Sequence, residues 1–424
     1  MDVFAVAGVI IFGLGYLSIA LEHKLNTNKA AVALAMGATL WILAALSGIE
    51  VEHALAEAGS EIFAIIIFLL SAMTLVEVLV HYNFFDSIRQ ALFRMKLGDR
   101  AQFAILVVIT FFASSILDNL TATIVMIQIS RNFFKGNNLL VMVAGIVLMA
   151  NAGGAWSPIG DVTTIMLWLG DKFSATQIMV EGILPALSFM GIATLLLAHQ
   201  IKTDTKDTLE AVEISFTRSE KVVIAAALGS FSLPVIMNLV GLPPYLGLLL
   251  GLGLVWMLVE LLRSRSSHMT HMEANIERLL QKTDLASIKF FAGILLAVSA
   301  LHAFGILHAL STILLGAEQT IDRVIIGNVA LGFLSSVLDN VPLTAMAMNI
   351  IALPDPSIWV LLALSVGIGG SFLVIGSAAG VVAMGMVKEL TFGRYMQIAT
   401  VPAVIAFMAC IGVWYAQYVL FFAG

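Results

Sequence analysis

The chain contains the stretch SSILDN at residues 114–119 and almost the same stretch, SSVLDN, at residues 335–340. Each copy lies inside a long apolar segment, the first at about 101–134 and the second at about 321–352. A single helix needs only about 20 residues to cross a bilayer. Both segments are therefore long enough for two half-crossings that turn at the repeated stretch. We interpret each as a helical hairpin that enters and leaves the membrane on one side.

The composition around these hairpins is that of a polytopic membrane protein. Of the 424 residues, 60% are hydrophobic and 11% are charged, whereas a soluble domain has about a quarter of its residues charged. The single cysteine, Cys410, excludes an internal disulfide and a multi-cysteine metal site. The first apolar run follows no basic segment, so we expect it to be a retained span. The remaining apolar runs predict spans at 3–21, 30–47, 61–80, 139–169, 178–198, 221–241, 244–262, 286–306, 357–387 and 395–421.

The distribution of basic residues supports the hairpin interpretation. If both hairpins return to the side from which they enter, 19 of the 21 lysines and arginines fall on the cytoplasmic side. Only Lys172 and Arg323 fall outside. Such a bias follows the positive-inside rule. A single crossing in place of either hairpin would reverse the side of every later loop.

The repeated stretch also divides the chain into two halves. The glycines at 153–154 and 160 recur at 369–370 and 376, an offset of 216 residues against 221 for the hairpin tips. Each half has three spans, a hairpin, a glycine-interrupted span and a final span. Five crossings per half place the second half upside down, which gives an inverted-topology repeat.

The sequence thus predicts an all-α polytopic membrane protein with two inverted-topology repeats, about 10 crossings and 2 re-entrant hairpins. The first repeat covers 1–200, with its hairpin at 101–134 and its broken helix at 139–169. A cytoplasmic linker covers 201–220. The second repeat covers 221–424, with its hairpin at 321–352 and its broken helix at 357–387. We expect a bacterial inner-membrane location, with both termini periplasmic.

The hairpin tips carry the first candidate ligands. An Asp-Asn pair is a poor helix interior and a good cap, so two half-helices would meet there. Freed carbonyls, a carboxylate, an amide and a hydroxyl would lie close together, and hard cations prefer such oxygen ligands. The tip residues are Asp118, Asn119 and Thr121 in the first half, and Asp339, Asn340 and Thr344 in the second.

The glycine-interrupted spans carry the second group. The stretch 151–161 reads NAGGAWSPIGD, and its three glycines and one proline should unwind a helix. Paired interrupted spans are the best sequence indication of a transport site near the midplane. The candidate ligands here are Asn151, Ser157, Asp161, Thr163 and Thr164, with Ser371 and Ser377 in the second half. Because Asp161 aligns with Ser377, we predict one cation site biased towards the first half, with Asp339 contributing from the other side.

These residues predict a cation exchanger. Three carboxylates and no basic residue lie at membrane depth, which favours cations over anions. A low-dielectric surrounding raises the pKa of a carboxyl group, and a bound sodium ion favours its ionised form. Competition of Na⁺ and H⁺ for the same aspartates, combined with alternating access, then suffices for exchange. We expect no cofactor besides the transported ions, no nucleic-acid partner and no enzymatic activity, since no protease or hydrolase motif is present.

The chain resembles the NhaD-type sodium/proton antiporters of the ion transporter superfamily. The two Ser-Ser-x-Leu-Asp-Asn tips and the stretch 151–164 carry the resemblance, which extends over nearly the whole chain. It implies exchange of Na⁺, and often Li⁺, for H⁺, by a homodimer with a scaffold domain and an elevator-like moving domain. It implies ion-binding or essential roles for Asp118, Asn119, Asn151, Asp161, Thr163, Thr164, Asp339, Asn340 and Ser377. From these and the residue types, we predict Na⁺ ligands at Asp118, Asn119, Asn151, Asp161 and Thr164.

Two alternatives stay open at this point. One is a sodium-coupled symporter of a dicarboxylate or another anion, or an arsenite-type exporter, of the same superfamily. Its sodium-dicarboxylate members have Ser-Asn-Thr at the tips, where this chain has Asp-Asn. The other is a passive channel, which the ligand types alone do not exclude. The polar loops at 200–221 and 263–284, including His268 and His271, are interpreted as solvated connections.

Overall fold

The computed structural model describes residues 3–20, 27–95, 97–131, 133–202, 215–265, 269–283, 285–307 and 319–422. Within these ranges the chain is helical and contains no strand. Seven of the described helices are long and apolar enough to cross a membrane, and four shorter helices are also apolar. The all-α polytopic fold expected from the sequence is therefore confirmed.

The helices of the first half follow the predicted order. They are α1 (Val3–Ala20), α3 (Lys29–Leu46), α4 (Val51–His81), α5 (Phe84–Arg94), α6 (Asp99–Ser114), α7 (Asn119–Ser130), α8 (Gly136–Gly154), α9 (Val162–Leu169) and α10 (Ala175–Ala198). The first predicted hairpin is the pair α6 and α7, and the broken helix is the pair α8 and α9.

The second half repeats this order. Its helices are α11 (Arg218–Ser230), α12 (Leu233–Leu239), α13 (Pro244–Arg265), α14 (Met269–Glu273), α15 (Ile276–Lys282), α16 (Leu285–Ala303), α18 (Ile321–Ser335), α19 (Asn340–Ile350), α20 (Pro356–Gly369), α21 (Ala378–Met386), α22 (Phe392–Tyr395), η1 (Met396–Thr400), α23 (Val401–Gln417) and η2 (Tyr418–Phe422). The second predicted hairpin is α18 and α19, and the second broken helix is α20 and α21.

Several predicted boundaries were wrong. The third span begins at Val51 rather than 61. The span predicted at 221–241 corresponds to α11 and α12, which together form one candidate span from Arg218 to Leu239. The loop predicted at 263–284 contains α14 and α15. The amphipathic helix α5 was not predicted, because its sequence FFDSIRQALFR alternates too many polar residues for a hydropathy search to find it.

The interpretation of His271 as a solvated loop residue was also wrong. Its side chain is fully buried, and its two ring nitrogens lie 3.1 Å from the Tyr82 hydroxyl and 2.8 Å from the Ser219 hydroxyl. These contacts join the end of α4, the start of α11 and α14. His268 lies outside the described residues.

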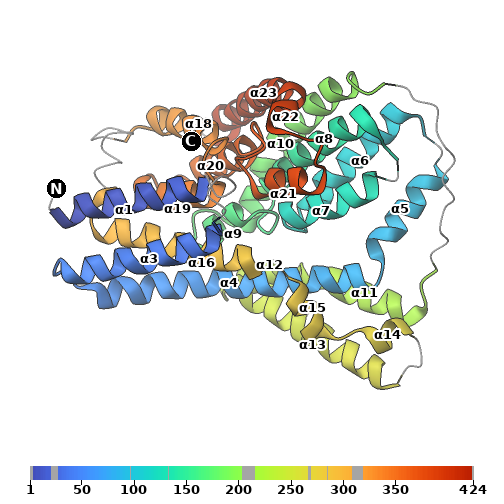
Figure 1. The fold of residues 1–424 in the computed structure, drawn as a ribbon, viewed down its shortest axis with the longest axis horizontal. Helices are drawn as coiled ribbons and strands as arrows, with labels where there is room; N and C mark the ends of the chain where they lie inside the picture. The colour runs from blue at the N-terminus through green and yellow to red at the C-terminus, as the bar shows by residue number, and fades with distance from the viewer. Residues whose placement is uncertain are drawn as a thin grey trace.

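The helices form two groups by their contacts, and Figure 1 shows most of one group above the other, with α1 drawn over α19. The first three spans of each half pack together, so that α1, α3 and α4 lie with α11, α13 and α16 in the lower part of the view. The hairpins, broken helices and final spans pack together above them, from α6 to α10 and from α18 to α23. Contacts between the groups include α4 with α9 and α16 with α19, and α5 contacts both α4 and α7. We call these the lower and the upper group.

Equivalent atoms in the two halves make the same contacts in the upper group. The Ser114 hydroxyl donates to the Ala150 carbonyl (2.6 Å), and the Ser335 hydroxyl donates to the Val366 carbonyl (2.8 Å). These partners are separated by the same offsets, 221 and 216 residues, that the sequence shows. The repeat visible in the sequence thus extends to atomic contacts, whereas its orientation in the membrane stays a prediction.

Glycine permits the closest of these approaches. A Cβ atom at Gly160 would lie 2.6 Å from the Ser114 carbonyl oxygen, and one at Gly376 would lie 2.5 Å from the Ser335 carbonyl oxygen. At Gly153 a Cβ atom would clash with the Phe111 backbone. Each hairpin tip is therefore pressed against the break of its own half, and any larger residue would push the two apart.

Candidate ion-binding site

The first hairpin tip places Asp118 at the start of α7. The stretch between Ser115 and Asp118 leaves the helical conformation, and Asp118 then caps α7. Its carboxylate accepts a hydrogen bond from the Thr121 backbone N–H (2.9 Å) and another from the Thr121 hydroxyl (2.5 Å). The positive end of the helix dipole lies at the same place, which favours a negative charge there. Asp118 and Thr121 are thus brought together, as predicted.

The break in the first interrupted helix places Asp161 in the same way. Residues 155–161 separate α8 from α9, and Asp161 caps α9 in a reciprocal arrangement with Thr164. The Thr164 hydroxyl donates to the Asp161 carbonyl (2.8 Å), and the Thr163 backbone N–H donates to the Asp161 carboxylate (3.3 Å). Asp161, Thr163 and Thr164 are all buried. The N-termini of α7 and α9 are therefore both capped by an aspartate, Asp118 at the first hairpin tip and Asp161 at the first break.

A single amide group joins the two breaks. Asn119 Nδ2 donates to Asn151 Oδ1 and to Asp161 Oδ2, both at 3.2 Å. The Asn151 amide nitrogen in turn donates to the Val147 carbonyl (2.9 Å) and to the Ser377 hydroxyl (3.1 Å). Four of the candidate residues predicted from sequence thus lie in one buried polar network, and Ser377 reaches it from the other half. We call Asn119, Asn151, Asp161 and Ser377 the central network.

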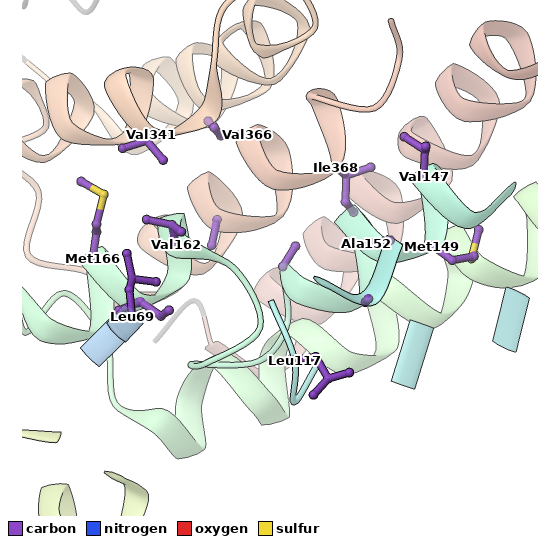
Figure 2. Close-up of a cluster of buried hydrophobic side chains, with 14 of the residues drawn as sticks. Leu69, Leu117, Val147, Met149, Ala152, Val162, Met166, Val341, Val366 and Ile368 are labelled. Carbon is purple, nitrogen blue, oxygen red and sulfur yellow. The ribbon is translucent and has the colours of Figure 1, made fainter. Parts of the chain in front are cut away.

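The surroundings of the central network are apolar. Figure 2 shows Leu69 of α4 beside Val162 and Met166 of α9, with Ala152 and Ile368 near the crossing of α8 and α20. Buried side chains of both halves belong to this one cluster. Electrostatic interactions are stronger in such a low-dielectric region than in water. The unpaired charge of Asp161 is consequently costly unless a cation or a proton compensates it.

The second tip is built alike but differs in chemistry. Asp339 caps α19 by accepting a hydrogen bond from the Val341 N–H (3.1 Å), and Asn340 accepts one from the Ser335 hydroxyl (2.6 Å). The position equivalent to Asn151 is Gly367, and that of Asp161 is Ser377. The second half therefore lacks the amide and the carboxylate that complete the central network in the first.

Asp339 is nevertheless close to the central network. Helix α19, which Asp339 caps, packs against α9, which Asp161 caps. Three aspartates consequently cap the helices that begin at the two hairpin tips and at the first break. The predicted contribution of Asp339 to the cation site stays a prediction.

The other predicted residues hold the backbone of the breaks. The Ser157 hydroxyl donates to the Ser115 carbonyl (2.5 Å), which ties the first tip to the first break. The Ser371 hydroxyl donates to the Ile368 carbonyl (2.6 Å), and the Thr344 hydroxyl donates to the Asn340 carbonyl (2.9 Å). These three hydroxyls are engaged in the geometry seen here, so the structure places them as supports of the breaks.

Thr163 differs from them. Its hydroxyl oxygen is fully buried and has no hydrogen-bond partner among the described residues. A buried hydroxyl without a partner costs about 1–3 kcal/mol. The Thr163 hydroxyl oxygen belongs to the α9 turn that Asp161 caps. It is therefore suited to bind a ligand that is not part of the protein.

Sequence analysis missed Tyr16. The Tyr16 hydroxyl accepts a hydrogen bond from the Asp339 backbone N–H (2.9 Å). The two residues are 323 positions apart, and α1 belongs to the lower group. No local pattern could have indicated this contact, because it depends on how the two groups pack.

Two cavities of about 280 Å³ each lie along α4. The first is lined by the N-terminal half of α4, by the end of α9 and by α16 and α19, and it includes Glu57, Glu61 and His302. The second is lined by the C-terminal half of α4, by α5 and by α7, and it includes Glu77 and Thr121. Between them, Phe68 and Leu69 of α4 are buried. The two cavities therefore lie along opposite halves of α4, on either side of Phe68 and Leu69.

Comparison with known proteins supports the interpretation of the fold. Residues 16–358 match the family described as CitMHS, citrate transporter. The chain is 36% identical over 408 residues to sodium/proton antiporter 1 of Arabidopsis thaliana, covering 93% of this chain and 69% of that protein. It is 34% identical over 408 residues to sodium/proton antiporter 2 of the same plant, covering 92% of this chain and 94% of that protein.

A bacterial relative shows the same extent of similarity. The Na⁺/H⁺ antiporter NhaD of Halomonas elongata is 29% identical over 431 residues, which covers 93% of this chain and 85% of that protein. The chain therefore belongs to the CitMHS, or citrate transporter, family, and its relatives place it among the NhaD-type members of the ion transporter superfamily.

Proposed function

We propose that this protein is a secondary transporter that exchanges Na⁺, and also Li⁺, for H⁺ across the membrane. The observation that carries the proposal is the single Asn119 amide that holds Asn151 Oδ1 and Asp161 Oδ2 at 3.2 Å each. The relatives described as sodium/proton antiporters support the same conclusion.

The amide group of Asn119 acts as a stand-in for a cation in this arrangement. Its NH₂ group carries partial positive charge and points at two oxygens, one of them a carboxylate. Rotation of the amide would replace this donor with the Asn119 oxygen. A sodium ion could then bind to oxygens of Asn119, Asn151 and Asp161, with the hydroxyls of Thr163 and Thr164 nearby. This ligand set is of the hard oxygen type that alkali cations prefer.

Exchange follows from competition at Asp161. The carboxylate can be neutralised in its apolar surroundings either by a sodium ion or by a proton. Binding of one releases the other, so each passage of the site across the membrane carries one species or the other. We propose Asp118 as a further ligand or proton carrier, because it directly precedes Asn119, whose amide donates to Asp161.

A citrate-type symporter is the competing proposal, and the family description favours it. A carboxylate substrate would need compensating positive charge at the breaks. The breaks at 115–118, 155–161, 336–339 and 370–377 contain no lysine, arginine or histidine, but they do contain three aspartates. The chemistry of these segments therefore favours the cation exchanger.

We further propose an elevator-like mechanism in a homodimer. The upper group contains both tips and both breaks, and it contacts the lower group through a few helices. This division supports movement of the upper group as one body past α4. The homodimer, the bacterial inner-membrane location, the re-entry of both hairpins and the periplasmic termini rest on the resemblance and on the distribution of basic residues.

Cation-induced proton movement in everted vesicles tests the proposal. A pH-sensitive dye would report proton flux after addition of Na⁺ or Li⁺ at several pH values. We expect flux in the wild type and its loss in Asp161→Asn and Asp118→Asn, each assayed at verified expression. A wild type that gives no cation response but takes up citrate with sodium would instead establish the symporter.

A further inference from the structure

The final span of the second half holds the second break through two hydroxyl groups. The Tyr395 hydroxyl donates to the Ser371 carbonyl, and the Thr400 hydroxyl donates to the Phe372 carbonyl, both at 2.6 Å. Tyr395, Ser371 and Phe372 are buried. Backbone carbonyls that follow the end of α20 thus receive hydrogen bonds from the side chains of another element, as buried polar groups require.

A π-helical segment brings these two hydroxyls together. Tyr395 and Thr400 are five positions apart, which is about 1.4 turns of an α-helix, so regular winding would direct them to different faces. The interval is occupied by η1, in which the i→i+5 hydrogen bonding widens the turn and brings residues five apart towards one face. Single π-helical turns of this kind are rare, and they frequently occur at functional sites.

Pro402 accounts for the irregular winding. Proline has no backbone N–H, and its ring clashes with the carbonyl four residues earlier, which is that of Ile398. The Ile398 carbonyl instead accepts a hydrogen bond from the Gln200 side-chain amide (3.1 Å). The sequence therefore encodes the wide turn, and a residue at the end of the first half supplies the hydrogen bond that proline cannot.

The final span of the first half has different side chains at the equivalent positions. Pro185 of α10 aligns with Pro402. This alignment places Ile178 and Ile183 at the positions of the two hydroxyl-bearing residues, and isoleucine cannot donate a hydrogen bond. The two hydroxyls therefore belong only to the half that contributes Ser377 to the central network.

The second break determines where Ser377 lies. Ser377 caps α21, and its hydroxyl accepts a hydrogen bond from the Asn151 amide nitrogen at 3.1 Å. The break is held at its start by the two hydroxyls of the final span. Near its end it is held by Gly376, where a Cβ atom would lie 2.5 Å from the Ser335 carbonyl oxygen. The position of Ser377 relative to Asn151 depends on both supports.

We infer that Tyr395 and Thr400 are positioning residues for cation exchange, which hold the second break so that Ser377 meets Asn151 in the central network. The inference rests on the proposed cation exchange. It assigns the final span a part in forming the ion site, although neither hydroxyl touches the central network itself.

Tyr395→Phe is the first test, because it removes one hydroxyl and keeps the ring. Na⁺-driven proton flux would be measured in everted vesicles over a range of Na⁺ concentrations. We expect the Na⁺ concentration for half-maximal flux to rise about fivefold, the effect of one lost hydrogen bond. The maximal flux should stay within about twofold of the wild type, since the lost interaction concerns binding.

The substitutions at Thr400 give a test that does not depend on Tyr395→Phe folding well. Thr400→Val keeps the shape and removes the hydroxyl, so it should raise the half-maximal Na⁺ concentration as Tyr395→Phe does. Thr400→Ser keeps the hydroxyl and should have the wild-type value. Stabilisation of the purified protein by Na⁺ in detergent gives the same concentration without transport.

A double substitution distinguishes positioning through Ser377 from a general loss of stability. Ser377→Ala should itself raise the half-maximal Na⁺ concentration. Adding Tyr395→Phe to it should raise that concentration no further, because residues that act through one shared partner are not additive. An equal further rise in the double variant would overturn the inference.

Tyr418→Phe is the matched control. The Tyr418 hydroxyl donates to the Asp355 carboxylate (3.0 Å), at the start of α20 and about 20 Å along that helix from the break. This control removes a tyrosine hydroxyl bond from the same end of the chain without touching the break, so the half-maximal Na⁺ concentration should equal that of the wild type. Equal values for Tyr395→Phe and Tyr418→Phe would overturn the inference, as would equal values for Thr400→Val and Thr400→Ser. A wild type without any cation response would refute the proposed function itself, which is a separate outcome.

Discussion

Each oxygen of the central network has a distinct task at the scale of single residues. Asn119 joins the two breaks, Asn151 brings in Ser377 from the other half, and Asp161 carries the charge that must be compensated. The Thr163 hydroxyl is the one predicted ligand whose oxygen is buried without a partner among the described residues. A residue that contributes to ion binding but nothing to the ion-free fold can be recognised by experiment.

Thr163→Val should separate binding from folding. Valine has nearly the shape of threonine and removes an unsatisfied hydroxyl, so the melting temperature without Na⁺ should be unchanged or higher. The Na⁺ concentration for half-maximal exchange should rise about 5- to 30-fold, which corresponds to about 1–2 kcal/mol for a lost ligand. Thermal unfolding in detergent and vesicle flux would measure the two effects.

Thr194→Val is the control for this pair of measurements. The Thr194 hydroxyl of α10 is also buried without a partner among the described residues, but it is remote from the breaks in sequence. Its replacement should give the same stability effect with no change in Na⁺ dependence. A loss of Na⁺ affinity in both variants would show that packing, rather than a ligand, is being measured.

Most of the central network could be predicted from the sequence because each member breaks a local rule. Asn119, Asn151 and Asp161 are polar at membrane depth, beside residues that end a helix, and such residues are expensive there unless they have a function. Tyr16 breaks no such rule, since tyrosine is common near membrane surfaces, and its contact with Asp339 depends on distant parts of the chain. The hydrogen bonds from Ser157, Ser371 and Thr344 to backbone carbonyls could not be predicted either, because a hydroxyl in a break is equally suited to bind an ion or to support the backbone.

At the scale of elements, the breaks work because their backbones approach one another closely. Gly153 of α8 faces the Phe111 backbone of α6, and Gly369 of α20 faces the Gly332 backbone of α18. These positions are equivalent in the two halves. The glycines therefore fix the distance between each hairpin and its broken helix, and with it the position of the tips relative to the central network.

Gly153→Ala should disrupt this spacing. Its Cβ atom would clash with the Phe111 carbonyl, and a backbone oxygen cannot move aside as a flexible side chain can. Overpacking of this kind costs about 1–3 kcal/mol. We expect a lower melting temperature together with reduced exchange, measured on protein purified in detergent and on the same protein in vesicles.

Gly191→Ala provides the comparison within the same group of helices. Gly191 lies in α10, and a Cβ atom there would meet nothing within 4 Å. Alanine is favoured over glycine in a helix interior by about 1 kcal/mol, so stability should stay equal or increase. If both substitutions proved harmless, the close approach of α6 and α8 would not be the constraint that the structure indicates.

The elements themselves were predictable where hydropathy and helix breakers agree. The tips at Asp118 and Asp339 and the breaks near 155–161 and 370–377 were predicted because aspartate, glycine and proline end helices locally. Helix α5 and the buried position of His271 were missed, because both are stabilised by contacts with other elements rather than by a continuous apolar run.

At the scale of the whole molecule, the internal repeat explains the division into two groups. The first three spans of both halves associate, and so do the two sets of hairpins and broken helices. The sequence pattern indicated the repeat, whereas only the family resemblance implied a scaffold and a moving domain, because nothing local specifies which spans of one half meet those of the other. Within the upper group, α7 contacts α21 and α19 contacts α9, so each hairpin meets the broken helix of the opposite half. Ser377 reaches the central network by this exchange.

If the upper group moves past α4 as one body, a link between the groups should stop transport while a link within one group should not. The Phe68 ring of α4 and the Trp168 ring of α9 are in contact across the groups, with their centroids 6.4 Å apart. In a Cys410→Ala chain, Phe68→Cys and Trp168→Cys joined by a short bifunctional maleimide should abolish exchange, although each single cysteine stays active.

Val107 and Gly145 lie on α6 and α8 within the upper group, and a Cβ atom at Gly145 would be 3.0 Å from Val107 Cγ1. A disulfide between cysteines at these two positions should therefore form without loss of activity. Full exchange by the linked Phe68–Trp168 pair would exclude sliding of the upper group along α4, and it would require a mechanism in which only the tips move.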